Sequence, residues 1–360
     1  MTGTEACIAL NMVPNLGPVR LRKLLEVFET PERVLLARAA ELKTVDGIGK
    51  EIAEGIASWE AHVDLAAELR RIGEFGAHVF TRESPEYPRD LREIYNPPIV
   101  LYVWGTLTER DHRAVGVVGS RKTSHYGLEC AKKLSYQLAY AGLTVVSGLA
   151  RGIDTSAHQG ALAAEGRTVA VIGSGLMKLY PAENQGLAEK ITQSGAVVSE
   201  YPMEFPPTRE NFPYRNRIVA GWGQGILVVE AGLNSGALIT AGQAIEHGRQ
   251  VYAVPGPIDR PSAAGSNRLI QQGAKLVTGA GDILDDLNIL LPAERPKTAA
   301  SETLTDEEQA VLNTLEEGET SLDDLATKCR LPIQKVSSTL LALEMKRRVK
   351  VLPGQHFARL

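Results

Sequence analysis

Segment 212–217, with the sequence FPYRNR, carries the side chains best suited to bind an anion. Arg215 and Arg217 bracket Asn216 immediately before an apolar run that predicts a helix. Two guanidinium groups beside a helix N-terminus form a strong anion site, because charged donors and the helix dipole act together. Arg209, a little upstream, adds a further cation. We therefore expect at least one of these arginines to hold a phosphate group.

Aromatic side chains are interleaved with these cations, at Phe212 and Tyr214. Single-stranded nucleic acid binds to such a combination, since arginines hold its phosphates while an aromatic ring stacks on a base. An alternative places both rings in the hydrophobic core. In that case the arginines would pair with one of the acidic residues Glu200, Glu204 and Glu230. The sequence leaves both arrangements open.

Four glycine-bearing turns follow predicted strands, either directly or after a short polar segment. Their sequences are VGSR, SGLAR, GSG and NSG. Apolar, β-branched runs predict buried strands, and backbone N–H groups at the turns that follow can cradle a phosphate. The candidate binding residues in these turns are Gly119, Ser120, Arg121, Gly148, Arg151, Gly173, Gly175, Ser235 and Gly236.

Nucleotide cofactors and metals fit the sequence poorly. It contains neither GxGxxG nor GxxxxGK[ST], and no acidic residue ends the second core strand at Ser147, where dinucleotide-binding proteins place a ribose ligand. NAD and ATP are therefore disfavoured, and we expect no cofactor. The three cysteines are scattered and no His cluster has metal spacing, which disfavours a zinc site and a disulfide framework.

Asp154 and His158 lie four residues apart at the start of a predicted helix. On one helix face they could form an acid–base pair. The favoured interpretation is structural, with Asp154 capping the helix and His158 satisfied locally. Glu230 could serve as a catalytic carboxylate if the protein is an enzyme.

Alternating strands and helices must position these residues. Strands are predicted at 114–118, 143–147, 168–172, 196–199, 225–229, 250–254 and 274–277. Helices are predicted at 126–141, 154–164, 184–194, 213–222, 236–247, 265–272 and 282–290. This alternation indicates an α/β fold with a doubly wound, mostly parallel sheet, which binds ligands at the carboxyl ends of its strands.

Further parts flank this sheet. Residues 5–72 have helical periodicity, and VDGIGKEIAEGI at 45–56 has the form of a helix-hairpin-helix turn. Its glycines would let a phosphate approach, or they serve the turn geometry alone. Residues 77–112 carry two strand-like runs, AHVFT and PIVLYVWG, and are expected to form an extension packed beside the main sheet. The predicted domains are a helical region 1–76, a core 77–290, a linker 291–305 and a winged helix 306–360.

The C-terminal unit reads as three helices followed by a hairpin with a Pro-Gly turn, which is the pattern of a winged helix-turn-helix. Segment 302–324 has nine acidic residues and no basic one. For this unit, a contact with another protein is therefore at least as favoured as the recognition of double-stranded DNA.

Bulk charge and hydropathy limit the remaining possibilities. The net charge of −4 argues against a broadly basic nucleic-acid binder, so phosphate binding must come from a local cluster. Neither a signal-peptide pattern nor a run of about 18 apolar residues is present. We expect a cytoplasmic protein with no membrane partner.

Ordered motifs extend over the whole core: VGSR, SGLARGID, GSGL, SEYP, FPYRNRI, SGALITA, VPG and GSNRLIQQGA. This set resembles the DNA-processing protein A (DprA/Smf) family, and the resemblance covers essentially the whole chain. It implies an extended Rossmann-like core, a helical N-terminal domain of helix-hairpin-helix or sterile-alpha-motif-like type, and a winged-helix tail.

The resemblance also implies a function. The family's role would be that of a non-catalytic, single-stranded DNA-binding recombination mediator in natural transformation. It would protect incoming strands and load the RecA recombinase onto them, as a homodimer and with single-strand-binding protein as a further partner. Carried onto this chain, the DNA contacts would include Arg121, Arg209, Phe212, Arg215 and Arg217, together with the Ser235–Gly236 turn.

Two rival hypotheses remain. The same kind of sheet occurs in nucleotide phosphoribohydrolases of the lysine-decarboxylase-like type, where Glu230 would be the catalytic acid and Arg215 would bind the phosphate. Against this, NSGALIT stands where that family has a Gly-Gly-x-Gly-Thr turn. The second rival is a duplex-binding regulator that acts through the winged helix.

Overall fold

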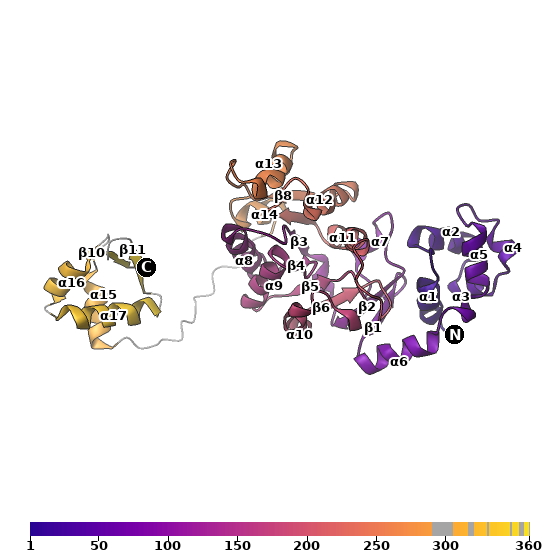
Figure 1. Cartoon of the computed structure of the whole chain (residues 1–360), viewed down its shortest axis with the longest axis horizontal. Coiled ribbons are helices and arrows are strands. Elements are labelled where there is room, and N and C mark those ends of the chain that lie inside the picture. The colour runs from indigo at the N-terminus through magenta and orange to yellow at the C-terminus, as the bar shows by residue number, and fades with distance from the viewer. Residues whose placement is uncertain (290–304, 316–319, 330, 346–347, 353–355, 360) are drawn as a thin grey trace. The chain divides into compact units, whose positions relative to one another are not determined.

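The computed structural model describes residues 1–289, 305–315, 320–329, 331–345, 348–352 and 356–359 (Figure 1). It divides into two compact units, Met1–Leu291 and Pro292–Leu360. The predicted linker 291–305 lies, apart from Thr305, outside the described residues. None of the described helices has the length and apolar character that a membrane span requires.

A nine-stranded sheet organises the first unit, with the strand order β1-β2-β6-β5-β4-β3-β7-β8-β9. Its strands are β1 (His78–Thr81), β2 (Val100–Gly105), β3 (Ala114–Val118), β4 (Thr144–Ser147), β5 (Thr168–Val171), β6 (Ala196–Ser199), β7 (Gly225–Val228), β8 (Gln250–Ala253) and β9 (Lys275–Leu276). Strands β3 to β9 pair in parallel, whereas β2 joins β6 and β1 joins β2 in antiparallel fashion. The doubly wound sheet and its N-terminal extension are thus confirmed.

Strand β3 is the point where the winding of the sheet reverses, because its neighbours are β4 on one side and β7 on the other. In the register, Val115 lies opposite Val145, and Val117 lies opposite Leu227. Open α/β sheets bind ligands outside the carboxyl ends of their strands at such a point. The loops that follow β3, β4, β5, β7 and β8 therefore form the edge where a site is expected.

Helices cover both faces of this sheet (Figure 1). They are α7 (Arg89–Arg92), α8 (His125–Tyr140), α9 (Ile153–Ala163), α10 (Gln185–Ser194), α11 (Asn211–Gly221), α12 (Gly236–Glu246), α13 (Ala264–Gln271) and α14 (Ala280–Asp286). α11 and α12 bury Ile218 and Ala241 against one face, while α8 and α9 bury Leu134 and Ala157 against the other. α7 was not predicted, and the other helices begin and end within two residues of the predicted bounds, except for the end of α14.

The N-terminal region is helical as predicted, with α1 (Gly3–Met12), α2 (Pro18–Phe28), α3 (Pro31–Leu36), α4 (Ala39–Leu42), α5 (Lys50–Ala57) and α6 (Leu65–Phe75). In its helix-hairpin-helix turn, Gly47 has a φ of +82°, a left-handed conformation that favours glycine, and Gly49 is the N-cap of α5. Lys43 and Lys50 around this turn both pair with Glu54. These two lysines are thus partnered by an acidic side chain, whereas Arg20 donates to the Gly47 carbonyl in the turn itself.

The second unit is a winged helix. Its helices are α15 (Asp306–Thr314), α16 (Leu322–Cys329) and α17 (Ile333–Met345). Its sheet consists of β10 (Thr320–Ser321), which lies between α15 and α16, and of β11 (Val349–Leu352) and β12 (His356–Arg359), which follow α17. Its core includes Leu325, Val336 and Leu340. The Ser321 hydroxyl accepts from the Asp324 N–H at the start of α16, the bond expected where Ser precedes an acidic residue by three positions.

Candidate nucleic-acid interface

Helix α11 begins at Asn211, two residues before the predicted start, and this shift changes the position of the arginines. Arg215 and Arg217 lie in the body of the helix, so they do not stand beside its free N-terminal amides. Both are buried, with 3% and 2% of their surface exposed. The predicted anion site, formed by two guanidinium groups at a helix N-terminus, is therefore wrong in its geometry.

Arg217 makes a buried ion pair. Its two terminal nitrogens each donate to one carboxylate oxygen of Glu200 at 2.6 Å, and its Nε donates to the Asn96 carbonyl. Its guanidinium also lies 4.0 Å from the centre of the Tyr214 ring. The predicted phosphate contact by Arg217 is corrected, and the alternative pairing with Glu200 is the one that the structure has.

Arg215 ties α11 to the ends of two strands. Its Nη1 donates to the Gly148 carbonyl at 2.8 Å and to the Val171 carbonyl, so the helix is fastened to the loop after β4 and to β5. Its Nε donates to the Asn216 side chain at 3.2 Å. Burial lowers the pKa of Arg215 to about 10, against the opposing effect of Asp154. Arg215 thus forms the base of a pocket and is not a freely accessible phosphate ligand.

Asp154 and His158 form no acid–base pair. Asp154 accepts from the Gly148 and Ala150 N–H groups, while His158 is bonded through Nδ1 to Thr168. Burial raises the pKa of Asp154 to about 6 and lowers that of His158 to about 3. Both residues therefore have structural roles, but the predicted cap is wrong: the N-cap of α9 is Gly152, and Asp154 stabilises the preceding turn instead. His158 is satisfied locally at Nδ1 alone, since its Nε2 is buried without a hydrogen-bond partner in the described part of the chain.

The arginine pocket lies over the carboxyl ends of β3, β4 and β5. We define it by Arg121, Gly148, Ala150, Arg151, Tyr180, Pro181, Phe212 and Arg215. The Arg121 guanidinium lies 5.0 Å from the centre of the Phe212 ring, and the Tyr180 ring is 5.7 Å from the same ring. Arg121 is exposed, and within the described residues its side chain makes no hydrogen bond or ion pair. A cation and two aromatic rings thus meet at one opening.

Arg151 is on the rim of this pocket, but a carboxylate neutralises it. Its Nε and Nη2 donate to the two oxygens of Glu183 at 2.6 and 2.7 Å, and both side chains are about half exposed. An exposed ion pair is weak and is screened by salt. A phosphate group can therefore compete with Glu183 for Arg151.

The glycines of the predicted cradle serve close packing. A Cβ on Gly148 would lie 2.6 Å from Arg215 Nη2, and one on Gly173 would lie 2.9 Å from the Phe212 ring. Gly119 packs in the same way against Ile153, and Gly175 packs against the Pro202 carbonyl. Gly148 and Gly173 thus let the pocket side chains Arg215 and Phe212 approach the sheet, and all four glycines have a packing role that differs from the predicted direct phosphate contact.

Other predicted residues lie outside the arginine pocket. Arg209 is exposed in the loop before α11. The Ser120 hydroxyl donates to the Lys122 carbonyl and shapes the turn that carries Arg121. Ser235 caps α12 by accepting from the Ala237 N–H, and a Cβ on Gly236 would meet open space.

Sequence analysis missed Tyr180, Pro181 and Ala150 as pocket residues. Tyr180 and Pro181 follow the GSGL motif, and the neighbour of Tyr180 in space, Phe212, lies 32 residues further along the chain. The aromatic ring of Tyr180 beside the conformationally restricted Pro181 was the feature of the sequence that could have indicated a pocket residue.

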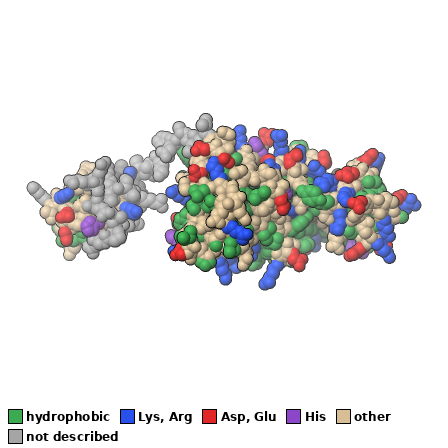
Figure 2. Space-filling view, turned by 90° about the horizontal axis from the view of Figure 1, so that it is seen from above, with side chains coloured by type: hydrophobic (Ala, Val, Ile, Leu, Met, Phe, Trp, Pro, Cys, Tyr) green, Lys and Arg blue, Asp and Glu red, His purple; other side chains and the backbone are tan. Residues whose placement is uncertain are grey.

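Charge on the surface is mixed. In the view of Figure 2, basic and acidic side chains are interspersed over the first unit and do not form one broad basic field. Among the described residues, no group of three or more His, Cys, Asp or Glu side chains is placed to hold a metal ion. The cationic site is local, as the net charge of −4 requires.

These features define a class: an α/β protein with a Rossmann-like sheet, a helix-hairpin-helix region, a winged helix and an arginine–aromatic pocket at the strand ends. The model of the DNA recombination-mediator protein A family matches residues 78–288. The DprA winged helix domain matches residues 295–355, and a SAM-like helix-hairpin-helix tandem matches residues 8–58. The chain belongs to the DNA recombination-mediator protein A family, so the resemblance noted in the sequence is confirmed.

Three relatives illustrate this similarity. Protein Smf of Synechocystis sp. is 35% identical, with 98% of each chain aligned. The X-ray structure of DNA processing protein A from Streptococcus pneumoniae is 36% identical with a TM-score of 0.70, and the match covers 79% of this chain and 98% of that one. A structure addressing the single-stranded DNA binding mode of DNA processing protein A from Helicobacter pylori is 26% identical with a TM-score of 0.53, over 59% of this chain and 97% of that one.

The buried Arg217–Glu200 pair allows a stability prediction. Glu200→Ala leaves the Arg217 guanidinium buried without its counter-ion, so the free energy of unfolding should fall by about 3–5 kcal/mol. Urea denaturation followed by tryptophan fluorescence measures this, because all three tryptophans lie in residues 1–291.

Glu183→Ala is the matched control, because it also removes the carboxylate of an arginine pair, but an exposed one. This variant should unfold close to the wild-type midpoint. Equal destabilisation by both substitutions, or none by Glu200→Ala, would contradict the structural role of the buried pair.

Proposed function

We propose that this protein binds single-stranded DNA at the arginine pocket and mediates recombination without catalysing a reaction. The observation that carries the proposal is the exposed, unpaired Arg121 guanidinium stacked on Phe212 at the carboxyl edge of the sheet. Family membership supports DNA as the ligand. The relative from H. pylori, whose single-stranded DNA binding mode has been described, supports a single strand.

In the proposed mechanism Arg121 holds a phosphate, while the wall formed by Phe212 and Tyr180 stacks on a base. Tyr180 is 41% exposed and offers its ring beside Phe212. Arg151 binds a second phosphate when it exchanges Glu183 for the strand, and Arg209 extends the contact along the backbone. Arg215 contributes indirectly, by holding the Gly148 loop and Phe212 in register.

A non-catalytic role is favoured over the phosphoribohydrolase hypothesis by the position of Glu230. Its carboxylate accepts from the Thr123 hydroxyl and from the N–H and hydroxyl of Ser124. Burial acts to raise the pKa of Glu230, but the hydrogen bonds together outweigh it and hold the pKa below the usual value. Glu230 and Arg215, the acid and the phosphate ligand of that hypothesis, line two different pockets. A single small substrate would not reach both.

The finer parts of the function follow from the family resemblance. The strand bound here is DNA taken up in natural transformation, and the protein protects it and loads the RecA recombinase onto it in the cytoplasm. The active form is a homodimer, and single-strand-binding protein is a further partner. The winged helix serves a protein contact, in keeping with the acidic segment 302–324.

Charge reversal at Arg121 tests the site. Arg121→Glu should abolish binding of a fluorescein-labelled oligothymidylate in an anisotropy titration. The chain should stay folded, because the Arg121 side chain is exposed and its recorded contact is with the Phe212 ring. In Arg121→Ala, the slope of log affinity against log salt should become shallower by about 0.7, the value for one lost phosphate contact to a single strand.

Arg113→Glu is the control for Arg121→Glu. Arg113 is exposed and precedes β3, so it lies at the opposite, amino end of the same strand. The Arg113→Glu variant should bind the labelled strand nearly as well as the wild type. Unchanged binding by Arg121→Glu, or an equal loss in both variants, would remove the basis of the site.

Release of Arg151 gives a gain-of-function test. Glu183→Gln should tighten binding of the same strand by about two- to fivefold at low salt, with the gain fading as salt rises. Glu189→Gln is the control, since it removes an exposed carboxylate that pairs with Gln185 and frees no arginine. If both variants bind alike, Arg151 takes no part in the interface.

Deletion of the winged helix distinguishes DNA binding by the core from the hypothesis that the winged helix binds duplex DNA. A fragment of residues 1–291, which forms one compact unit, should keep the preference of the full chain for a single strand over a duplex of the same sequence. Loss of all DNA binding in this fragment would favour a regulator that acts through residues 306–360.

A further inference from the structure

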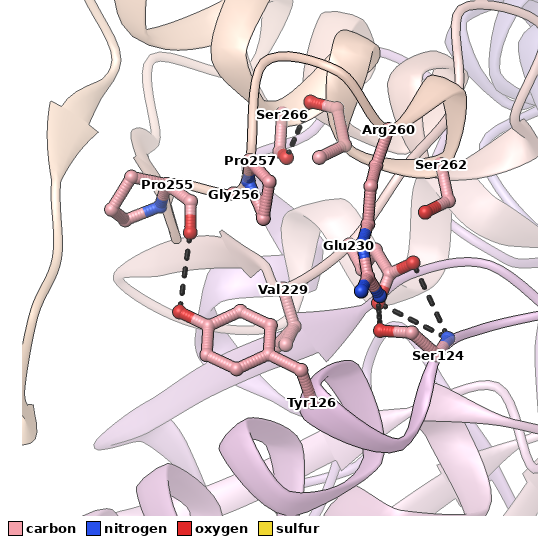
Figure 3. A pocket seen from close by; sticks show the side chains of 11 residues that line it. Ser124, Tyr126, Val229, Glu230, Pro255, Gly256, Pro257, Arg260, Ser262 and Ser266 are labelled. Carbon is pink, nitrogen blue, oxygen red and sulfur yellow. Dashed lines mark hydrogen bonds between the residues drawn. The ribbon is translucent and has the colours of Figure 1, made fainter.

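A second pocket lies at the carboxyl edge of the same sheet and has no part in the site described so far (Figure 3). Its volume is about 450 Å³, against about 30 Å³ for the arginine pocket. It is built from the start of α8, the ends of β7 and β8, and the loop that leads to α13. We call it the Tyr126 pocket, after the side chain that forms one wall.

The walls of the Tyr126 pocket are largely apolar. They are formed by Val229, Pro255, Pro257 and Ala263 and by the ring of Tyr126, which is 48% exposed. The Tyr126 hydroxyl donates to the Pro255 carbonyl at 3.2 Å, so the ring is fixed as a wall of the cavity (Figure 3). An anchored aromatic ring with prolines beside it suits a flat ring such as a nucleobase.

Arg260 supplies a cation at the same pocket. It belongs to the loop after β8, is exposed, and extends toward Ser124 (Figure 3). In the described part of the chain its side chain makes no hydrogen bond or ion pair. The carboxylate of Glu230 also lines the pocket and disfavours an anion inside it. The Arg260 cation offsets this carboxylate, so a nucleotide with its base against Tyr126 would place its phosphate at Arg260.

The two pockets flank one loop. Arg121 lines the arginine pocket, and Ser124 of the same loop lines the Tyr126 pocket. The loop is fixed between them, since the Ser120 N–H donates to the Glu230 carbonyl at 2.7 Å and the Glu230 carboxylate binds Ser124. One pocket lies over β4 and β5 and the other over β7 and β8, on either side of the reversal at β3.

We propose that the Tyr126 pocket is a second nucleotide subsite for the same single DNA strand, with a base on Tyr126 and the adjoining phosphate on Arg260. This rests on the proposed function, because it extends the path of the strand from the arginine pocket across the 119–124 loop. A polymer occupies both pockets, whereas a short strand fills only the arginine pocket.

The test is the dependence of affinity on strand length. Oligothymidylates of about 4 to about 16 nucleotides, the range of site sizes for OB-fold binders, are titrated by anisotropy against the full chain. Tyr126→Leu and Arg260→Ala should leave the shortest strands unaffected and weaken the longest by at least about fivefold, as expected for one lost stacked base. Arg268→Ala is the control, since Arg268 is an exposed arginine on the adjacent α13, outside the pocket.

The outcomes distinguish the second subsite from the proposed single-strand binding at the arginine pocket. Wild-type affinity for long strands in both variants, with Arg121→Glu inactive, overturns the second subsite and leaves the proposed function standing. Failure of the wild type to bind any strand overturns the proposed function itself. A parallel titration with thymidine monophosphate tests whether the ligand of the Tyr126 pocket is a free nucleotide, which offers the same base and phosphate as a DNA strand. Binding of the free nucleotide that Arg260→Ala removes, with long strands unaffected, makes the pocket a mononucleotide site and overturns the proposal.

Discussion

The buried guanidinium of Arg215 is the interaction on which the DNA-binding edge of this protein depends. It reaches from α11 to the Gly148 carbonyl and the Val171 carbonyl, while Asp154 holds the N–H groups on the other side of the same turn. A buried charge is tolerated only when hydrogen bonds and a counter-charge compensate for its lost hydration. Helix, loop and strand end are therefore locked together, and Phe212 is carried to the pocket by the same helix.

This lock explains how a protein with net charge −4 can present a cationic site. Arg215 and Arg217 are buried and make structural hydrogen bonds and an ion pair, and Arg151 is paired with Glu183. Arg121 is the exposed cation that stacks on Phe212. Binding then relies on position and stacking more than on long-range attraction. The Tyr126 pocket, on the other side of the Arg121 loop, repeats this plan with one aromatic ring and one arginine.

The sheet and its helices could be predicted from the sequence because strand and helix periodicities were regular and several core strands were followed by a glycine-bearing turn. The site could be predicted only in outline. FPYRNR marks an arginine-rich segment, but the start of α11 at Asn211 decides which arginines face inward, and no local pattern fixed that start. Glu183 meets Arg151 across 32 residues, and Tyr180 meets Phe212 through the fold alone, so neither pair was visible in sequence.

The central claim is that a single strand lies on the carboxyl edge of the sheet over the arginine pocket. Hydrogen–deuterium exchange of the full chain, with and without a saturating oligothymidylate, tests it most directly. Protection should appear in the loops at 119–124, 148–152 and 180–183 and at the start of α11, with the helix-hairpin-helix turn at 45–50 unchanged. Protection confined to that turn or to the winged helix, with these loops exchanging as in the free protein, would contradict it.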